Sequence, residues 1–349
     1  MDLVRSIAGH KWRILSVFIC IPTYYYIQRF SKEFYYFFLF TSATILSLYF
    51  LTLITPLNLI PIVTMSREFV NANRIWFNNP GYIYIFPIVL VVYLLLKPKI
   101  KYKNLLLFVG FGSFLSIILT LTRGTILFLL GNILISIILV KHIFNLSISK
   151  WIQRSVFAFA FLLITSGIIF PDVIDNIMET AKKSISELSG EISEGATQSR
   201  SEFEVPIMLK LINENTWLGT GMLEEYFSHY SEKTEIGVAD VPLLGHIAMY
   251  GILGFTIYLL RYFKINTLIK SYYPLLKRNI SHLNTYEILL LIWAISSFYA
   301  NIFFKFFNFS SEIYNPDSYI IFGISIGIIF GLMNKLLIIT NENRNYILQ

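Results

Sequence analysis

Long apolar runs alternate with short charged clusters along the whole chain. Nine of these runs approach the roughly 20 residues that a helix needs to cross the hydrocarbon core of a bilayer. The pattern therefore predicts an all-α polytopic membrane protein in a single domain, residues 1–349, with about nine transmembrane helices and ten as the alternative. The expected spans cover residues 14–29, 34–55, 81–96, 104–121, 125–140, 152–170, 241–260, 286–304 and 318–339.

The composition agrees with a membrane protein. Hydrophobic residues make up 55% of the chain and charged residues only 14%, against about 25% charged residues in soluble domains. The net charge of +7 could suggest nucleic acid as a partner, but the basic residues lie between the spans rather than on one continuous face. Cys20 is the only cysteine, which excludes an intrachain disulfide and a cysteine metal site. The expected partner is the lipid bilayer.

The first apolar run is expected to remain in the protein. It extends from Ile14 to Ile27 after several basic residues, as a signal peptide would. The residues that follow it, from Gln28 to Lys32, contain no small-residue cleavage site. We therefore interpret this run as the first span.

Basic residues in the short connections predict the orientation, because such residues concentrate on the cytoplasmic side. One set of connections and the C-terminal tail hold 16 Lys and Arg residues, against seven in the opposite set of short segments. The C-terminus is therefore expected inside and, with nine spans, the N-terminus outside. Residues 1–13 are interpreted as an interfacial helix or as the sign of a missing initial span. The 16 basic residues are Arg29, Lys32, Lys97, Lys99, Lys101, Lys103, Lys141, Lys150, Arg154, Arg261, Lys264, Lys270, Lys277, Arg278, Lys335 and Arg344.

The long segment 172–240, between the sixth and seventh spans, is predicted to be a large outer loop. It holds 14 of the 21 acidic residues and only five basic ones, and long acidic segments are readily translocated. Apolar residues recur at helical spacing in two parts of it, from Ile174 to Ile192 and from Phe203 to Ile212. Each part predicts an amphipathic helix that lies on the membrane or covers the helical bundle.

Four outer arginines are candidates for binding an anion. Arg123 lies in the tight turn between two spans, where an arginine is costly unless it is paired or reaches water. It either extends to lipid headgroups or binds phosphate through its guanidinium. Arg200 either pairs with a nearby glutamate or adds a second phosphate contact. Arg67 and Arg74 lie in the first outer loop and could complete a pyrophosphate site.

Asp240 is the candidate general base, because it lies at the membrane surface where the seventh span begins. Its alternative role is to cap the N-terminus of that helix. His246, two turns further along, either takes part in the chemistry or bonds a neighbouring helix. His229 and Glu224, with the adjacent Glu225, are reserve candidates for acid–base work. The chain contains no P-loop, nucleophile elbow, zinc-protease motif or metal-ligand cluster, so no metal or cofactor is expected.

Four short motifs occur in a fixed order relative to the spans. They are Arg74 followed by Asn79-Pro80, Thr122-Arg123-Gly124, Arg200 followed by Trp217-Leu218-Gly219-Thr220-Gly221, and Asp240 followed by Gly251-Ile252-Leu253-Gly254. Together they resemble the motifs of the O-antigen polymerase and O-antigen ligase group of bacterial membrane glycosyltransferases. Ligases typically carry His-Asn where this chain has Asp240-Val241. The departure favours a polymerase over a ligase.

The resemblance implies a metal-independent, inverting transfer on the outer face of the bacterial inner membrane. The donor would be an oligosaccharide on undecaprenyl pyrophosphate, the product an O-antigen or capsular polysaccharide, and a chain-length regulator protein a possible partner. Arg123 and Arg200, assisted by Arg74, would bind the pyrophosphate, and Asp240 would be catalytic. The alternatives are a ligase that transfers glycan to lipid A core, a flippase or other transporter of lipid-linked glycan, and a structural partner subunit.

Overall fold

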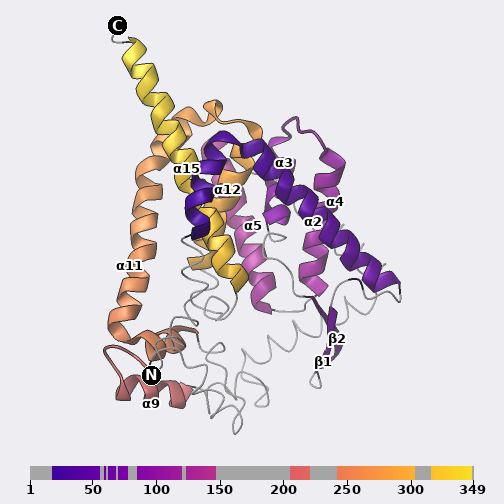
Figure 1. Ribbon diagram of the computed structural model, residues 1–349, viewed down its shortest axis with the longest axis vertical. Helices are drawn as coiled ribbons and strands as arrows, with labels where there is room; N and C mark the ends of the chain where they lie inside the picture. Colours follow the sequence, from indigo (N-terminus) through magenta and orange to yellow (C-terminus); the bar gives the residue numbers. More distant parts are fainter. Residues whose placement is uncertain are drawn as a thin grey trace.

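The computed structural model describes residues 18–55, 59, 62–67, 70–77, 85–119, 123–146, 205–220, 242–302 and 316–347. These residues form a helical bundle with one small β-hairpin (Figure 1). Besides a helical segment over 18–29, the first part of the bundle consists of α2 (Ser31–Ile54), α3 (Ile85–Leu96), α4 (Lys103–Leu119) and α5 (Arg123–Phe144). The later part consists of α9 (Val205–Glu214), α11 (Pro242–Asn279), the 3-10 helix η4 (Ile280–His282), α12 (Thr285–Ala300) and α15 (Pro316–Ile347).

The expected helices are confirmed wherever the structure describes their positions. Eight of the nine predicted spans coincide with helices, and the ninth, 152–170, lies outside the described residues. Three described helices are long and apolar enough to cross a membrane by themselves: Ser31–Ile54, Leu244–His282 and Ile320–Thr340. The number of nine spans therefore stays a prediction. The predicted helix in the second apolar part of the outer loop is α9.

The first outer segment, 56–80, differs from an all-α expectation. Strands β1 (Ile62–Arg67) and β2 (Val70–Phe77) pair there as an antiparallel hairpin, in which Met65 lies opposite Arg74. The hairpin contacts α4. The two strands pair only with each other in the described part of the chain. The hairpin is therefore a small addition to a helical protein and does not change its fold class.

Helix α11 is longer than the span predicted over 241–260. It continues to Asn279 and is kinked at Gly251, which has φ 62° and ψ −179°. A short arm, 242–250, precedes the kink, and a long arm, 252–279, follows it. Arg261, interpreted above as part of a cytoplasmic connection, therefore lies within a helix, nine residues after the start of the long arm. The prediction of a loop at this position was wrong, because the exposed Lys264 and Lys270 gave the long arm the charge pattern of a loop.

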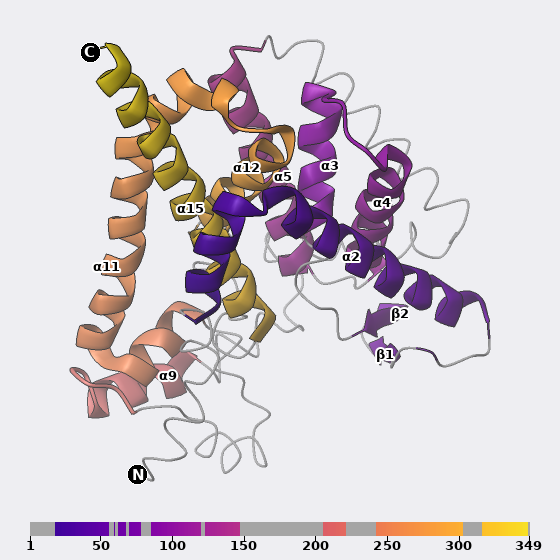
Figure 2. The same cartoon turned by 45° about the horizontal axis from the view of Figure 1, so that its top comes forward.

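Helix α12 forms the centre of the bundle. It contacts α2, α3, α5 and α15, and every residue from Leu289 to Ile295 is at most 1% exposed. A helix that is apolar all round is stable only when it is surrounded on all sides. Helices α2, α3, α5 and α15 accordingly lie around α12 (Figures 1 and 2).

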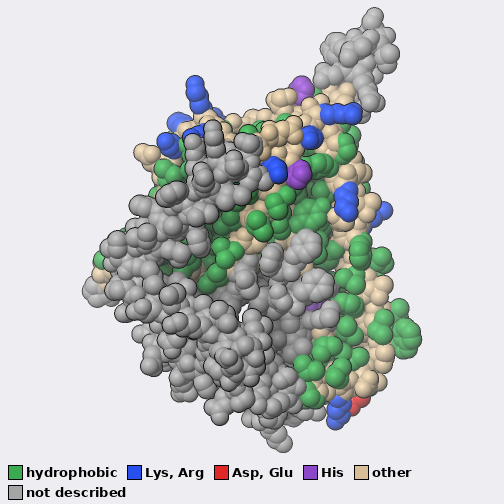
Figure 3. Space-filling model, turned by 180° about the vertical axis from the view of Figure 1, so that it is seen from behind, with side chains coloured by type: hydrophobic (Ala, Val, Ile, Leu, Met, Phe, Trp, Pro, Cys, Tyr) green, Lys and Arg blue, Asp and Glu red, His purple; other side chains and the backbone are tan. Residues whose placement is uncertain are grey.

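The two ends of the bundle match the two sets of connections. The α3–α4 connection, the end of α11 and the C-terminal end of α15 lie at one end, and the hairpin and α9 lie at the other (Figures 1 and 2). Lys and Arg side chains gather mostly at the first end (Figure 3). We call the first the basic end and the second the hairpin end. By the positive-inside rule the basic end is predicted to face the cytoplasm, and this orientation stays a prediction.

A buried carboxylate joins three helices at the basic end. Glu287 is 1% exposed and forms an ion pair with Lys335 of α15, whose Nζ atom lies 2.6 Å from Glu287 Oε1. The hydroxyl of Ser31, at the start of α2, donates to the same Glu287 oxygen at 3.0 Å, and the backbone N–H of Asn284 donates to the other oxygen at 3.0 Å. Asn284 in turn caps α12 by accepting the N–H of Glu287. The carboxylate is thus paired and hydrogen-bonded, as a buried charge must be.

Lys335→Met is therefore expected to destabilise the protein by about 3–5 kcal/mol, because it leaves a buried carboxylate without its counter-charge. Thermal unfolding in detergent measures the effect. The matched control is Lys210→Met on α9, whose 4.0 Å pair with Glu214 has side chains that are 69% and 53% exposed. Such a pair contributes less than about 1 kcal/mol. Equal midpoints for the two variants would contradict the structural role of Glu287.

Candidate functional site

The candidate residues are distributed unevenly over the described part of the chain. The structure describes His246 completely, and it describes the backbone of Arg67, Arg74 and Arg123. The remaining candidates lie outside the described residues, so their mutual geometry stays a prediction; they are Arg200, Glu224, Glu225, His229 and Asp240.

The backbone brings two of the predicted phosphate-binding arginines to the same end of the bundle. Helix α4 ends at Leu119, and Arg123 is the first residue of α5. Strand β2, which carries Arg74, contacts α4. Both arginines therefore belong to segments of the hairpin end. The first N–H groups of α5 add the positive end of a 22-residue helix beside Arg123, which favours an anion there.

Two of the four sequence motifs meet in one backbone junction. The segment 216–220, which follows α9, packs against α11 at its kink. The N–H of Thr220 donates to Ala248 O at 2.9 Å, the N–H of Ile252 to Thr216 O at 2.9 Å and the N–H of Leu253 to Trp217 O at 3.2 Å. The side chains of Met208 and Leu211 on α9 pack on Ala248 and Met249. We call this contact the glycine junction.

Both glycines of the glycine junction are required by its geometry. Gly219 has φ 71° and Gly251 has φ 62°, values that side-chain-bearing residues rarely adopt. A Cβ atom on Gly251 would overlap the carbonyl group of Trp217, and one on Gly219 would overlap the carbonyl group of Met249. The kink frees backbone groups of α11, and the segment 216–220 hydrogen-bonds them. Within a membrane protein that replacement is obligatory.

The sequence did not reveal the glycine junction. The two motifs are about 30 residues apart in the sequence. A contact between two backbones produces no periodic pattern of hydrophobic residues that could be recognised there. The available signal was a glycine pair in each motif, Gly219 with Gly221 and Gly251 with Gly254. Isolated glycines in an otherwise helical pattern often mark a close backbone approach.

His246 lies on the short arm of α11, in the corner that this arm makes with the long arm. It is 2% exposed, and its ring centroid is 5.0 Å from that of Tyr258 and 6.1 Å from that of Tyr250. The aromatic contact with Tyr258 joins the two arms across the kink. This packing supports a structural role for His246 in holding the corner, and it leaves the acid–base role untested.

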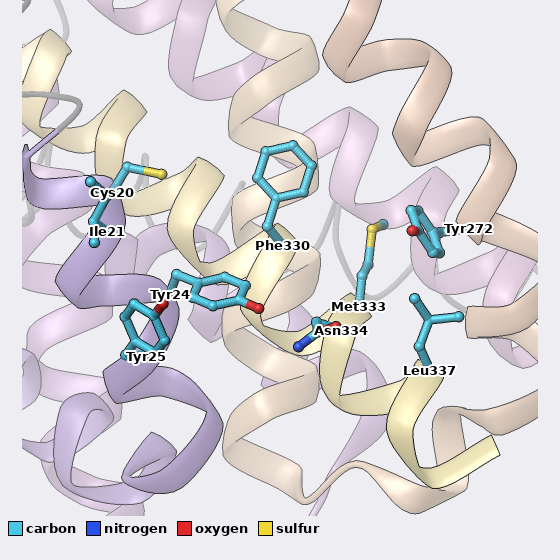
Figure 4. A pocket seen from close by; sticks show the side chains of 9 residues that line it. All are labelled: Cys20, Ile21, Tyr24, Tyr25, Tyr272, Phe330, Met333, Asn334 and Leu337. Atoms are coloured by element: carbon cyan, nitrogen blue, oxygen red, sulfur yellow. The ribbon is translucent and has the colours of Figure 1, made fainter. Parts of the chain in front are cut away.

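A cavity of about 430 Å³ lies elsewhere in the bundle (Figure 4). Its lining comes from the segment 18–29, from α11 and from α15, and it is mostly apolar. None of its lining residues carries a carboxylate, a guanidinium or an ammonium group, so the cavity lacks the groups for glycosyl transfer. The lining residues are Cys20, Ile21, Tyr24, Tyr25, Tyr272, Phe330, Met333, Asn334 and Leu337.

The residues that the structure describes contain no group of three or more His, Cys, Asp or Glu side chains that could hold a metal ion.

Part of the chain is similar to a known protein family. Residues 108–259 match the family model described as O-antigen ligase. The matched segment begins in α4 and ends in the long arm of α11, so it includes Arg123, Arg200, Asp240 and the glycine junction. No curated protein and no solved structure matches the chain.

Proposed function

We propose that this membrane protein is the polymerase of lipid-linked oligosaccharide repeat units, because residues 108–259 match the family model described as O-antigen ligase. The family match supports a membrane enzyme of the ligase or polymerase type. The choice of polymerase depends on one observation. Asp240-Val241 stands eleven residues before Gly251-Ile252-Leu253-Gly254, at the place where ligases carry His-Asn.

The proposed reaction extends a glycan on its lipid carrier. The donor is an oligosaccharide on undecaprenyl pyrophosphate, and the acceptor is a hydroxyl at the non-reducing end of another lipid-linked repeat unit. The acceptor oxygen forms a bond to the anomeric carbon while the bond from that carbon to the pyrophosphate oxygen breaks. Attack from the opposite face inverts the anomeric centre. Undecaprenyl pyrophosphate leaves with the bonding electron pair.

The candidate residues fit this reaction chemically. Asp240 would take the proton of the acceptor hydroxyl. Arg123 and Arg200, with Arg74 assisting, would stabilise the charge that develops on the departing pyrophosphate. Guanidinium groups bind phosphate oxygens in a bidentate way, so these fixed cations can act without a metal ion. The position of Arg74 and Arg123 in segments of the hairpin end supports a site on the outer face of the bacterial inner membrane.

Two alternatives predict different products. A ligase would use the same donor and transfer the glycan to lipid A core. A flippase or other transporter would move the lipid-linked glycan without transferring it. Arg261 lies within α11, a helix long and apolar enough to cross a membrane, and charges within spans are typical of transporters. The family match and the absence from the sequence of a recognisable inverted repeat favour the enzyme.

The test is a transfer assay with the purified protein in detergent. The protein is incubated with undecaprenyl-pyrophosphate-linked repeat units from its own host, and the products are separated on a gel. A ladder of glycans is expected. Transfer only after addition of lipid A core would identify a ligase, and no transfer to either acceptor would exclude both enzymes.

Asp240→Asn is expected to lower the rate of ladder formation by about 10²–10⁴-fold, because the acceptor hydroxyl loses its general base. The matched control is Glu214→Gln, which removes an exposed carboxylate at the end of α9 and is expected to leave the ladder unchanged. A wild-type rate in Asp240→Asn would remove Asp240 from the mechanism.

A further inference from the structure

An aromatic box surrounds Arg261 on the long arm of α11. Its guanidinium carbon lies 4.6 Å from the ring centroid of Tyr258, 4.8 Å from that of Tyr262 and 4.6 Å from that of Phe322. The Arg261 Nη2 group also donates a hydrogen bond to the Tyr262 hydroxyl at 3.1 Å. Two helices thus form the box, because Phe322 belongs to α15.

The box lies in the half of the bundle nearest the hairpin end. Phe322 is close to the start of α15, and Phe298 is close to the end of α12; both of these helix ends are directed toward the hairpin end. The Tyr262 ring lies 5.6 Å from Phe322 and 6.0 Å from Phe298. Arg261 is therefore at the depth of these two rings, although its sequence neighbourhood suggested the cytoplasmic side.

The charge of Arg261 is not balanced by a carboxylate in the described part of the chain. The described ion pairs there are Lys210–Glu214 and Lys335–Glu287. The Nε atom of Arg261 is buried and has no hydrogen-bond partner among the described residues. Arginine stays protonated in proteins, and a charge within a span normally pairs with an opposite charge. The aromatic rings provide only part of that compensation.

Lys335 provides a comparison, because it is a partly buried cation with a structural role and a carboxylate partner. Its ammonium group is only partly exposed, and it lies 2.6 Å from a carboxylate that is itself fully hydrogen-bonded. Arg261 has rings instead of a carboxylate. The aromatic faces fix the position of the guanidinium, and one of its N–H donors has no partner among the described residues. Such a group can bind the anionic part of a ligand.

The surroundings indicate what kind of anion this is. The side chains of Ile257, Leu260 and Phe263, on the same arm of α11, are 57–69% exposed and would face lipid. A ligand at this depth must combine an anionic group with an apolar chain. The Tyr258 hydroxyl lies 3.1 Å from that of Tyr262, and the Tyr258 ring contacts His246 of the short arm, so the box is continuous with the corner below the glycine junction.

We propose that Arg261 is a further phosphate-binding residue, which binds the lipid-linked diphosphate of the donor from within the membrane. This inference depends on the proposed function, because the same diphosphate would be held by Arg123 and Arg200. Arg261 lies just beyond the segment that matches the ligase family, residues 108–259. Tyr258, Tyr262 and Phe322 act as positioning residues that fix the guanidinium.

The test measures binding of undecaprenyl diphosphate, which carries no sugar, and of uncharged undecaprenol to the full-length protein in a non-ionic detergent. Wild type is expected to bind the diphosphate much more tightly than undecaprenol. Arg261→Gln is expected to weaken diphosphate binding about tenfold to a hundredfold, the usual effect of a lost hydrogen bond to a charged group, and to leave undecaprenol binding unchanged. The matched control is Lys264→Gln, an exposed cation on the same arm, which is expected to bind like wild type.

Three results would overturn the inference. Wild-type diphosphate binding by Arg261→Gln, together with a loss in Arg123→Ala, would reject Arg261 and leave the proposed function intact. Equal binding of diphosphate and undecaprenol by the wild type would reject the proposed function itself. Displacement of the diphosphate from wild type by an equal amount of phosphatidylglycerol would assign Arg261 to phospholipid phosphate and reject the donor.

A second variant covers the case in which Arg261→Gln does not fold. Arg261→Lys keeps the charge but lacks the planar fork. It is expected to bind the diphosphate about threefold more weakly, a fraction of the effect of a lost charge-assisted hydrogen bond, with undecaprenol unchanged. A purely structural role would alter both ligands together, and an unchanged diphosphate affinity would overturn the proposal.

Discussion

Arg123→Ala is expected to abolish the glycan ladder, with a fall in rate of at least about a hundredfold. That is the usual effect of removing one fixed donor that stabilises a developing negative charge. Arg123 is the first residue of α5, four residues after the end of α4 at Leu119. The helix N-terminus and the guanidinium would act on the same phosphate, so the truncation would remove the side-chain donor and leave the backbone N–H groups of the helix in place.

Two further variants separate charge from geometry. Arg123→Lys keeps a positive charge without the bidentate fork, so a rate between those of wild type and Arg123→Ala is expected. Arg278→Ala is the matched control, because Arg278 is an exposed arginine at the opposite end of the bundle. Each variant is first checked for wild-type elution in size-exclusion chromatography. A full ladder from correctly folded Arg123→Ala would remove the guanidinium from the proposed mechanism.

The helices could be predicted from the sequence because a membrane allows few alternatives. Backbone groups within a bilayer must be satisfied internally, so an apolar run such as that of α2 can only be a helix. The central helix α12 was predicted as the span 286–304 from its apolar run alone, and the structure adds the capping box of Asn284 and Glu287 at its start. Charge in the connections distinguished two sides, and the described Lys and Arg side chains gather mostly at the basic end (Figure 3).

The boundaries of α11 could not be predicted, because a lysine near a membrane can belong either to a loop or to the exposed face of a helix. Lys264 and Lys270 are exposed on the long arm, and long side chains of this kind extend from a helix to the interface. In the sequence they look the same as loop lysines. Arg261 was assigned to the cytoplasm for the same reason, whereas its guanidinium is enclosed by rings from two helices. Only tertiary contacts distinguish the two cases.

The candidate site could be predicted as residue types in an order, but not as a geometry. The hairpin of β1 and β2 depends on pairing between Met65 and Arg74 and their neighbours, and the pairing has no strong turn signal in the sequence. The glycine junction depends on hydrogen bonds between segments that are about 30 residues apart. In both cases the deciding interactions are between backbones, and side-chain patterns report on them only indirectly.

Gly251→Ala is expected to lower the free energy of unfolding by about 3 kcal/mol or more. Part of the loss comes from the backbone conformation, φ 62° and ψ −179°, which is essentially restricted to glycine. The rest comes from the overlap of the new Cβ with the Trp217 carbonyl group, which forces apart the hydrogen bonds from Ile252 and Leu253 to the segment 216–220. Transfer activity is expected to fall with stability, because the glycine junction attaches the outer loop to the bundle.

Thermal unfolding in detergent, followed by the loss of the monodisperse elution peak, measures this prediction. The matched control is Gly112→Ala in α4, where the nearest atom to the new Cβ is Phe50 Cε2 at 3.1 Å, the end of a side chain that can move. That variant is expected to differ from wild type by less than about 1 kcal/mol, as helix propensity alone would favour alanine. A wild-type midpoint for Gly251→Ala would show that α11 can straighten without the segment 216–220.

A double variant shows whether the two glycines stabilise one junction or two independent turns. Gly219→Ala is expected to break the same contact from the other side, because its Cβ would overlap the Met249 carbonyl group. Residues that depend on a shared contact give non-additive effects. The double variant should therefore be little less stable than the worse single variant. Additive losses in the free energy of unfolding would mean that each glycine only permits its own local turn. The two motifs would then lie side by side without stabilising each other.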